Sequence, residues 1–490
     1  MTGRSTATIL VILLASAPPA YSQEGIPPPV QLPIPTLEEA PPPIQFVEED
    51  PAPVQGAIPA PFDAYPPQDV MTPFDTFPPQ AEAPAPAAPS AFTGLEAESL
   101  PAEIAEDEGP LVPEGFRLGP APVSDVGILR GLLGLDDFLS RRGLRSFGWV
   151  ESGYTGSSTG AGLLSVAPRL NRFGDYYLVN QIGLTLSKPL EQDRFNVGFN
   201  VRYFAGADAA AGQPKGGIGS GNSYQLFNHD FRDLNISAHL PVLTEGGVDF
   251  KIGRMNTIIG YNGYLSPYRP FYSSDYQFWY LQDGAFTGFL FDFHITDRLN
   301  VWSGMTLGAN TFFVNRSARS YCYIGQIDYW LTEDRKTRLT ASVYAGPDAL
   351  FSAPGMGGTF DTMVEMRIQR NWTERFTQII QSNIGWDSNT PVGTRGSGAY
   401  GVYTIGLFHL TPHFDFNARG EWFKDVGGVR TGFAADYAEA TVGINWHPTK
   451  WLEIRPEVRG DFASQPAYGG GTDGGHYKQL TSVISTLIKF

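Results

Sequence analysis

The chain has 490 residues, a formal net charge of −16 and a single cysteine. One cysteine excludes an internal disulfide framework, and the absence of a basic patch argues against nucleic-acid binding. No stretch approaches the ~20 consecutive apolar residues that a membrane-spanning helix needs, so the exported chain is either soluble or crosses a membrane as strands.

Residues 1–22 have the features of a secretion signal. Arg4 supplies a positive charge, residues 9–15 form a short apolar core, and Ala20-Tyr21-Ser22 resembles a small-residue cleavage site. We therefore expect this segment to be a signal peptide that directs the chain out of the cytoplasm.

Residues 23–116 form an acidic, proline-rich tail. Between Glu24 and Phe116 lie 17 Asp and Glu residues, no Lys or Arg, and 23 of the 40 prolines. After Phe116 the chain is balanced, with 33 acidic and 33 basic residues. This composition cannot bury enough apolar surface to fold, which predicts an extended, disordered tail that we place in the periplasm.

The tail contains one near-repeat, at 61–68 and 73–80, in which each copy begins Pro-Phe-Asp and ends Pro-Pro-Gln. Two interpretations stay open. The repeat is either a duplicated piece of linker or a docking motif for the cell wall or an envelope protein, because aromatic anchors on a stiff backbone suit recognition by a groove.

Residues 117–146 are predicted to be a linker with a short helix. Ser124 can cap the helix, the apolar residues from Ile128 to Leu139 follow a helical stripe, and Gly143 can end it. We expect this amphipathic helix to pack at the periplasmic mouth of the following domain.

From Phe147 to Phe490 the hydrophobic pattern has a period of two. In 415–422 the apolar face holds Phe416, Ala418, Gly420 and Trp422, and the polar face holds Asp415, Asn417, Arg419 and Glu421. The segments 195–203, 437–446 and 453–459 alternate in the same way. These segments run near the ~9–11 residues that cross a bilayer at a tilt, whereas strands of soluble sandwiches average five or six.

The connections between these segments alternate between two sizes. Short connections are expected at 188–193, 243–247, 296–299, 332–337, 371–375, 411–413 and 447–450. Longer ones are expected around 156–177, 205–232, 256–284, 310–320, 346–359, 387–398, 425–433 and 462–478. This alternation predicts an all-β, antiparallel, up-and-down transmembrane barrel of about sixteen strands over 147–490.

Three segments resemble a known family. They are 135–154, then 264–268 with 283–290, and 451–459 with the terminal strand. They look like the β-barrel porin-2 family, the porin L-like outer-membrane proteins, and the long secreted tail resembles planctomycete members. The resemblance implies a porin-like role in the bacterial outer membrane.

Barrel size and lumen charge point to the same function. A barrel of about sixteen strands leaves an aqueous channel, and charges of both signs on the inner face need water. We therefore expect a porin for passive diffusion of small solutes or ions. The alternative is a structural anchor in which the barrel holds the membrane and the tail tethers the envelope.

The candidate pore-lining residues are the charged members of the polar faces. They are Glu365, Arg367, Asp415, Arg419, Glu421, Arg455, Glu457 and Arg459. Two interpretations stay open: the charges set a transverse field that gives weak ion selectivity, or they are ion-paired wall residues that hold water and strand register.

The long loop 256–284 is the candidate constriction, because it is unusually rich in aromatic residues. The candidates within it are Tyr264, Tyr268, Arg269, Asp275 and Tyr276. In general porins the third loop often folds into the lumen. The alternative is an aromatic lid or an oligomer contact at the rim.

Enzymatic features are weak. No Gly-x-Ser-x-Gly elbow is present, and His409 and His413 straddle a turn without a third ligand, so we expect no catalytic residue, cofactor or metal site. The expected partners are outer-membrane lipid and the barrel-assembly machinery, which would read the closing strand that ends at Phe490. A homo-oligomer is also compatible with the sequence.

Overall fold

The computed structural model describes residues 138–139, 141–164, 169–218, 226–282, 284–315, 321–346, 361–387, 397–428, 430–469 and 475–490. The expected signal peptide, the acidic tail and most of the linker lie outside these ranges, as do parts of several long loops. Of the expected linker helix, Phe138 and Leu139 are described and helical. The chain leaves this helix at Gly143, whose φ of 63° suits glycine.

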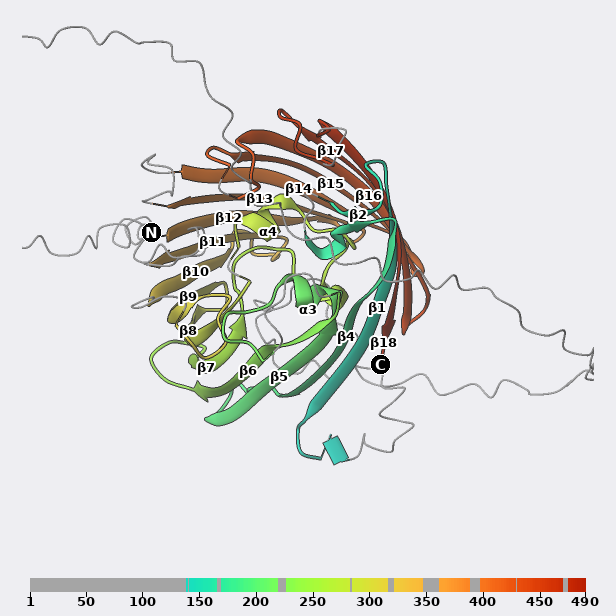
Figure 1. Cartoon of the computed structure of the whole chain (residues 1–490). Helices are drawn as coiled ribbons and strands as arrows, with labels where there is room; N and C mark the ends of the chain where they lie inside the picture. The colour runs from blue at the N-terminus through green and yellow to red at the C-terminus, as the bar shows by residue number, and fades with distance from the viewer. Residues whose placement is uncertain are drawn as a thin grey trace, which may run out of the picture. The chain divides into compact units, whose positions relative to one another are not determined.

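Sixteen strands form one closed antiparallel barrel in which each strand pairs with its neighbour in the chain (Figure 1). The first eight are β1 (Arg145–Ser157), β4 (Tyr176–Lys188), β5 (Asn196–Gly206), β6 (Asn228–Leu240), β7 (Val248–Asn256), β8 (Ala285–Thr296), β9 (Leu299–Ala309) and β10 (Cys322–Trp330). The others are β11 (Thr337–Gly346), β12 (Asp361–Thr373), β13 (Phe376–Asp387), β14 (Ser397–Thr411), β15 (Phe414–Asp425), β16 (Ala435–Thr449), β17 (Leu452–Ala463) and β18 (Lys478–Lys489). The predicted fold and strand number are confirmed.

The remaining elements lie in loops. The strands β2 (Gly162–Leu163) and β3 (Phe173–Gly174) pair with each other outside the barrel sheet. The short helices are η2 (Arg169–Asn171), α3 (Ala207–Ala211), η3 (Ser266–Tyr268) and α4 (Tyr276–Tyr280). Among the described residues, no helix has both the length and the apolar character required to span a bilayer.

The last residue closes the barrel. β1 pairs with β18 from Trp149 opposite Lys489 to Ser157 opposite Thr481. Beyond this ladder, Gly148 and Phe490 exchange backbone hydrogen bonds of 2.6 and 2.8 Å. A Cβ at position 148 would lie 2.2 Å from the Phe490 ring, so only glycine allows the terminal aromatic side chain to cover this strand.

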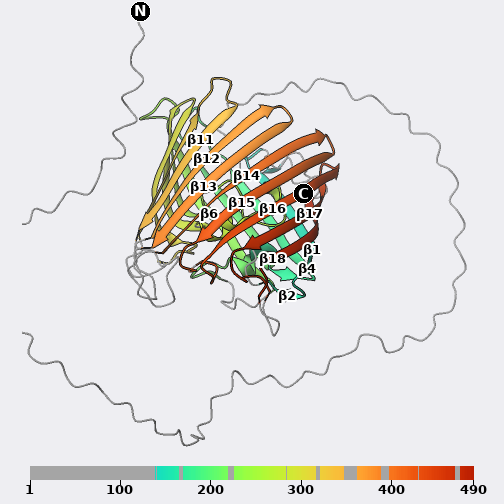
Figure 2. The ribbon, with the colours of Figure 1, turned by 90° about the horizontal axis from the view of Figure 1, so that it is seen from above.

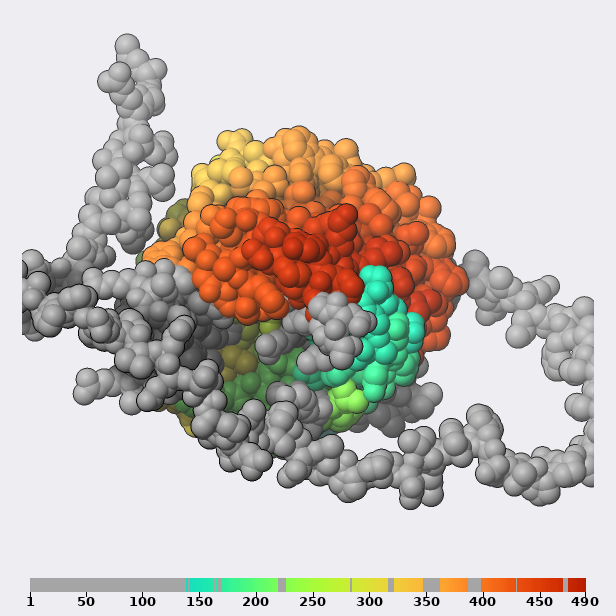
Figure 3. All heavy atoms as spheres, turned by 45° about the horizontal axis from the view of Figure 1, so that its top comes forward, coloured from blue at the N-terminus to red at the C-terminus, as the bar shows by residue number. Residues whose placement is uncertain are grey.

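The alternation of the sequence becomes two faces of the wall. Ile236 and Ile252 are opposite each other on β6 and β7, and both point outward, with 60% and 51% of their surface exposed. On β15, Trp422 points outward, whereas Arg419 and Glu421 point inward and are buried. Figure 3 shows the outer surface over the orange and red strands as a continuous wall. An apolar outer face of this extent requires lipid around it.

The two ends of the barrel differ in their connections, and Figure 2 shows the strands running obliquely between them. We call one end the short-turn end; its connections are 189–195, 241–247, 297–298, 331–336, 374–375, 412–413 and 450–451. The other end carries the long loops. The connection between β7 and β8, residues 257–284, is called the third loop below.

Candidate pore constriction

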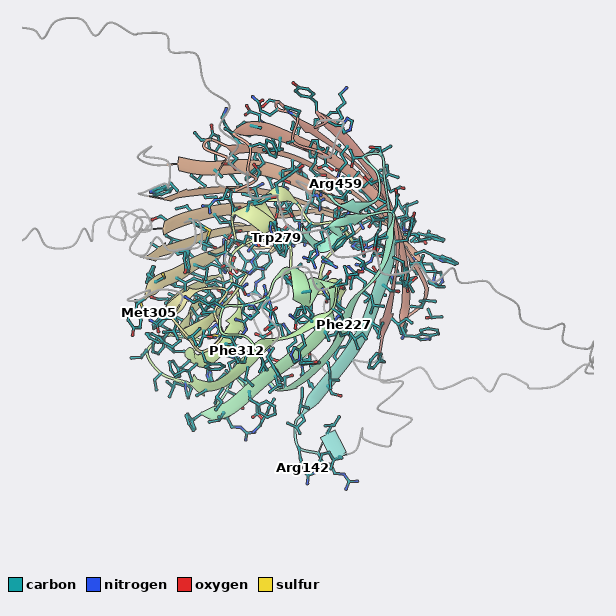
Figure 4. All side chains as sticks on the ribbon, viewed as in Figure 1. Arg142, Phe227, Trp279, Met305, Phe312 and Arg459 are labelled. Atoms are coloured by element: carbon teal, nitrogen blue, oxygen red, sulfur yellow. The ribbon has the colours of Figure 1, made fainter. Side chains whose placement is uncertain are left out.

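The third loop folds into the barrel instead of covering its rim. It forms hydrogen bonds with inward-facing side chains from well-separated strands: Gln381 on β13 accepts from the Tyr261 N–H at 2.8 Å, and Gln181 on β4 donates to the Tyr264 carbonyl at 2.9 Å. In Figure 4 the labelled Trp279 lies within the ring of strands, and Figure 1 shows α4 there as well. The loop therefore crosses the interior from one wall to another.

Aromatic side chains fix the loop by burying apolar surface against the wall. Tyr276 stacks on Phe423 with ring centroids 5.7 Å apart and also contacts Tyr437. Tyr264 packs in a separate cluster with Phe204 of β5. Each of these rings is almost fully buried, so the aromatic richness of the loop serves packing inside the barrel.

Carboxylates of the wall accept hydrogen bonds from the loop backbone. Glu421 on β15 accepts from the N–H groups of Tyr276 and Gln277, at 2.6 and 2.9 Å. Glu457 on β17 accepts from those of Tyr272 and Ser273, at 2.8 and 3.3 Å. Four backbone N–H groups of the loop thus find acceptors on two buried carboxyl groups of the wall, so these bonds hold the middle of the loop in place.

Arginines of the wall donate to the loop carbonyls. Arg419 donates to the Ser273 carbonyl at 3.1 Å, and Arg459 donates to the Ser274 carbonyl at 2.5 Å. Arg455 donates to the Arg269 carbonyl at 3.1 Å. The mixed charges on these strands thus match the mixed donors and acceptors of the loop backbone.

The charges beneath the loop are also paired with one another. Arg269 of the loop contacts Glu151 at 2.6 Å and Asp208 of α3 at 3.3 Å, and Arg455 binds the other oxygen of Glu151. Arg419 binds Glu439 at 2.5 Å. All of these side chains are buried, so removing one member leaves the cluster with one charge that is not balanced.

Burial and ion pairing shift the pKa of the Asp208 carboxyl in opposite directions. Burial raises the pKa of its carboxyl to about 6, and the nearby Arg269 opposes this rise by favouring the charged form. Asp208 also accepts from Asn180 at 2.9 Å and Gln181 at 2.7 Å. The loop between β5 and β6 is therefore joined to the same polar network as the third loop.

Of the other sequence-predicted residues, Asp275 is buried in the loop and caps α4 by accepting from the Phe278 N–H at 2.7 Å, whereas the rest lie apart from this network. Glu365 and Arg367 form a pair on β12 at 3.4 Å. Asp415 lies at the short-turn end, 2.8 Å from His409 and 3.0 Å from His447. Tyr268 belongs to the third loop but is only partly buried, with Arg202 over its ring at 5.5 Å.

Sequence reasoning missed several members of the network under the loop, namely Glu151, Asp208, Glu439 and Asp461. Asp461 binds Arg459 at 2.7 Å and accepts from the Tyr276 hydroxyl at 2.8 Å. Glu151 and Glu439 occupy inward positions of alternating segments, so the same period-two pattern could have identified them. Asp208 follows β5 in a loop, where no periodicity indicates which way a side chain points.

Three solved structures of bacterial proteins are similar to this chain in outline. The outer membrane channel DcaP of Acinetobacter baumannii has 11% identity and a TM-score of 0.48, with 71% of this chain and 97% of that chain covered. OprB of Pseudomonas putida has 12% identity and a TM-score of 0.48, covering 73% and 97%. An anion-selective porin from Comamonas acidovorans has 11% identity and a TM-score of 0.46, covering 71% and 99%.

The family comparison is decisive. Comparison with curated proteins finds no match. The family described as "Putative beta-barrel porin-2, OmpL-like" matches residues 143–490, which includes the whole barrel. Fold and family together indicate a channel rather than an enzyme. The chain therefore belongs to this family of outer-membrane porins, which form channels for passive diffusion.

Proposed function

We propose that this porin conducts small polar solutes and ions past a constriction whose size is set by the third loop. The observation that carries the proposal is the attachment of the loop backbone to Glu421, Glu457, Arg419, Arg455 and Arg459. A segment held through its main chain to several strands is well ordered, as a fixed constriction must be.

The groups that face the conducting path are expected on β5, β11 and β12, outside the strands whose side chains bind the loop backbone. Arg202 on β5, Arg338 on β11 and Arg367 on β12 have side chains that are 18%, 12% and 10% exposed, more than the arginines under the loop. Each is paired, with Asp233, Asp328 and Glu365 respectively. Paired charges of both signs give a transverse field and weak ion selectivity.

Conductance in planar bilayers tests the proposal. The untagged mature protein should give discrete steps, and weakening the loop attachment with a Glu421→Gln, Glu457→Gln double variant should give larger and noisier steps. The matched control is Arg335→Gln, in an exposed turn at the short-turn end, which should conduct like the parent. A correctly folded barrel without conductance would contradict the porin role and favour the anchor alternative.

The orientation of the barrel in the membrane and its partners are further parts of the proposal. We place the short-turn end and the N-terminal tail in the periplasm, because short turns face that side in outer-membrane barrels. The strand ending at Phe490 is the proposed contact for the assembly machinery, and a homo-oligomer and an envelope partner of the tail are further proposals. Protease accessibility of the tail in intact and permeabilised cells tests its side of the membrane.

A further inference from the structure

A polar cluster lies inside the wall near the short-turn end, outside the network under the third loop. It is formed by His239 on β6, Asp249 on β7, and Asp292 and His294 on β8. His239 is directly opposite Asp249, and Asp249 is directly opposite Asp292, so three of the four side chains form one row across adjacent strands.

This row places two carboxylates in an unfavourable position. Like charges directly opposite on neighbouring strands are destabilising, and burial increases the cost. Asp249 and Asp292 are 6% and 5% exposed. Lys251 contributes positive charge near both carboxylates, yet its single charge cannot neutralise two.

The contacts within the cluster leave one carboxylate oxygen without a well-placed donor. His239 Nδ1 lies 2.7 Å from Asp249 Oδ1, and His294 Nε2 lies 3.3 Å from Asp249 Oδ2. Asp292 Oδ1 makes no hydrogen bond of good geometry, although the Trp302 indole acts as a donor toward this carboxyl, and Oδ1 faces the His294 ring, with Nδ1 at 3.8 Å. A buried carboxylate oxygen that is aimed into a cluster of ligand atoms and lacks a well-placed donor is a place for a cation.

We propose that Asp249, Asp292 and His294 bind a divalent transition-metal ion such as Zn²⁺. One ligand atom from each residue lies within 4.8 Å of the other two. Zinc bonds to imidazole nitrogen and carboxylate oxygen are about 2.0–2.2 Å long, which places tetrahedral ligand atoms about 3.4 Å apart, so side-chain rotations that bring the three atoms closer by up to about 1.4 Å would close them around the ion. Carboxylate and imidazole ligands together suit Zn²⁺ better than Ca²⁺ or Mg²⁺, which prefer oxygen alone.

His239 has a different part in this site. Its hydrogen bond to Asp249 orients a ligating carboxylate, as outer partners commonly do in metal sites. Gly247, with φ of 78°, allows the turn 241–247 to pass the imidazole, since a Cβ there would lie 2.6 Å from its Cε1. The ion would thus link β7 and β8 directly and β6 through His239, which makes the site structural.

The test is metal binding by the untagged, full-length mature protein, folded and freed of metal with a chelator. Calorimetric titration with Zn²⁺ should show one equivalent bound, and Co²⁺ in place of Zn²⁺ should give the visible absorbance of nitrogen and oxygen ligation. Asp292→Asn and His294→Gln should each weaken Zn²⁺ binding at least tenfold.

A second histidine–aspartate cluster at the same end provides matched controls. Asp415 and His447 are 3.0 Å apart and are more exposed, so Asp415→Asn and His447→Gln should leave Zn²⁺ binding unchanged. The unboiled mobility shift in SDS checks the fold of every variant. If His294→Gln does not fold, Asp292→Asn decides, because it keeps the shape of the side chain.

Two outcomes would overturn the proposal. One is a parent protein that binds no stoichiometric Zn²⁺, which would make the cluster a proton-balanced network with His294 between two carboxylates. The other is binding that survives Asp292→Asn and is lost in Asp415→Asn. Neither outcome concerns conductance, so the porin proposal and the metal site are tested separately.

Discussion

Two groups of inward-facing arginines differ in their contacts: one group binds the backbone of the third loop, and the other pairs with carboxylates of the wall and remains partly exposed. Arg419, Arg455 and Arg459, which we call the loop-bound arginines, are buried and donate to carbonyls of the third loop. Arg202, Arg338 and Arg367, the open arginines, are paired on the wall but keep part of their surface exposed. The difference shows that an inward position does not by itself make a charge part of the conducting path.

The largest expected effect comes from breaking a loop-bound pair. Arg455→Gln leaves Glu151 with Arg269 as its only cation and removes a donor to the Arg269 carbonyl. Removing one partner of a buried pair costs about 3–5 kcal/mol, so the free energy of unfolding should fall by that order. Denaturant unfolding in detergent, followed by tryptophan fluorescence, measures it.

Two further variants make this measurement decisive. Adding Glu151→Gln should recover part of the loss, because Arg269 then remains paired with Asp208 and the cluster has no excess negative charge. Arg335→Gln removes an exposed pair and should change stability by less than about 0.5 kcal/mol. If Arg455→Gln behaves like Arg335→Gln, the loop-bound arginines do not hold the loop.

Acidification should act on the loop-bound region through Asp208. Its pKa is raised to about 6 by burial, above the ordinary value, so the folded state holds this proton more tightly than the unfolded state. By linkage, the contribution of Asp208 to the free energy of unfolding increases as pH falls from 7 to about 4, by an amount on the order of 2 kcal/mol.

The measurement compares two slopes. The free energy of unfolding of Asp208→Asn, taken relative to the parent, should fall by about 2 kcal/mol as the pH is lowered from 7 to 4, since the amide cannot take up the proton that stabilises the parent. Glu374→Gln, an exposed residue in a turn at the short-turn end, is the control and should keep the parental slope. Equal slopes in all three proteins would show that Asp208 titrates normally.

The sequence predicted the barrel because one face of each strand meets lipid and the other face meets the barrel interior. Arg419 and Trp422 alternate along one strand, and this alternation fixes which side meets lipid and which meets the interior. The sixteen strands and the closure at Phe490 follow from the same period and from the two sizes of connection.

The alternation of the sequence could not predict which inward charges bind the third loop. Arg367 and Arg419 both occupy inward positions, but among the described contacts it is Arg419 that donates hydrogen bonds to the third loop, because the path of that loop depends on side chains from distant strands. Similarly, His239 and His294 are far apart in the sequence, and only strand register brings both to Asp249.

The open arginines should control ion selectivity, which sharpens the comparison. Changing Arg202, Arg338 and Arg367 to Gln removes three positive charges and leaves their carboxylate partners uncompensated. The reversal potential in a salt gradient should shift toward cation preference, and more at low salt, because the Debye length is then longer. A triple Gln variant of the loop-bound arginines that still folds should shift it less. The reverse order of the two shifts would place the path under the loop.

The smallest expected effect concerns the point where the two regions meet. Tyr268 is the partly exposed member of the constriction candidates, and its ring lies against Arg202. Tyr268→Ala should therefore widen the path and raise single-channel conductance modestly, by less than about twofold. It should cost about 1 kcal/mol, the scale of a partly exposed cation–π contact.

Tyr268→Phe keeps the ring and should conduct like the parent, whereas Tyr276→Ala removes a buried anchor and should destabilise the loop instead. An unchanged conductance in Tyr268→Ala would mean that the path does not pass between this ring and β5.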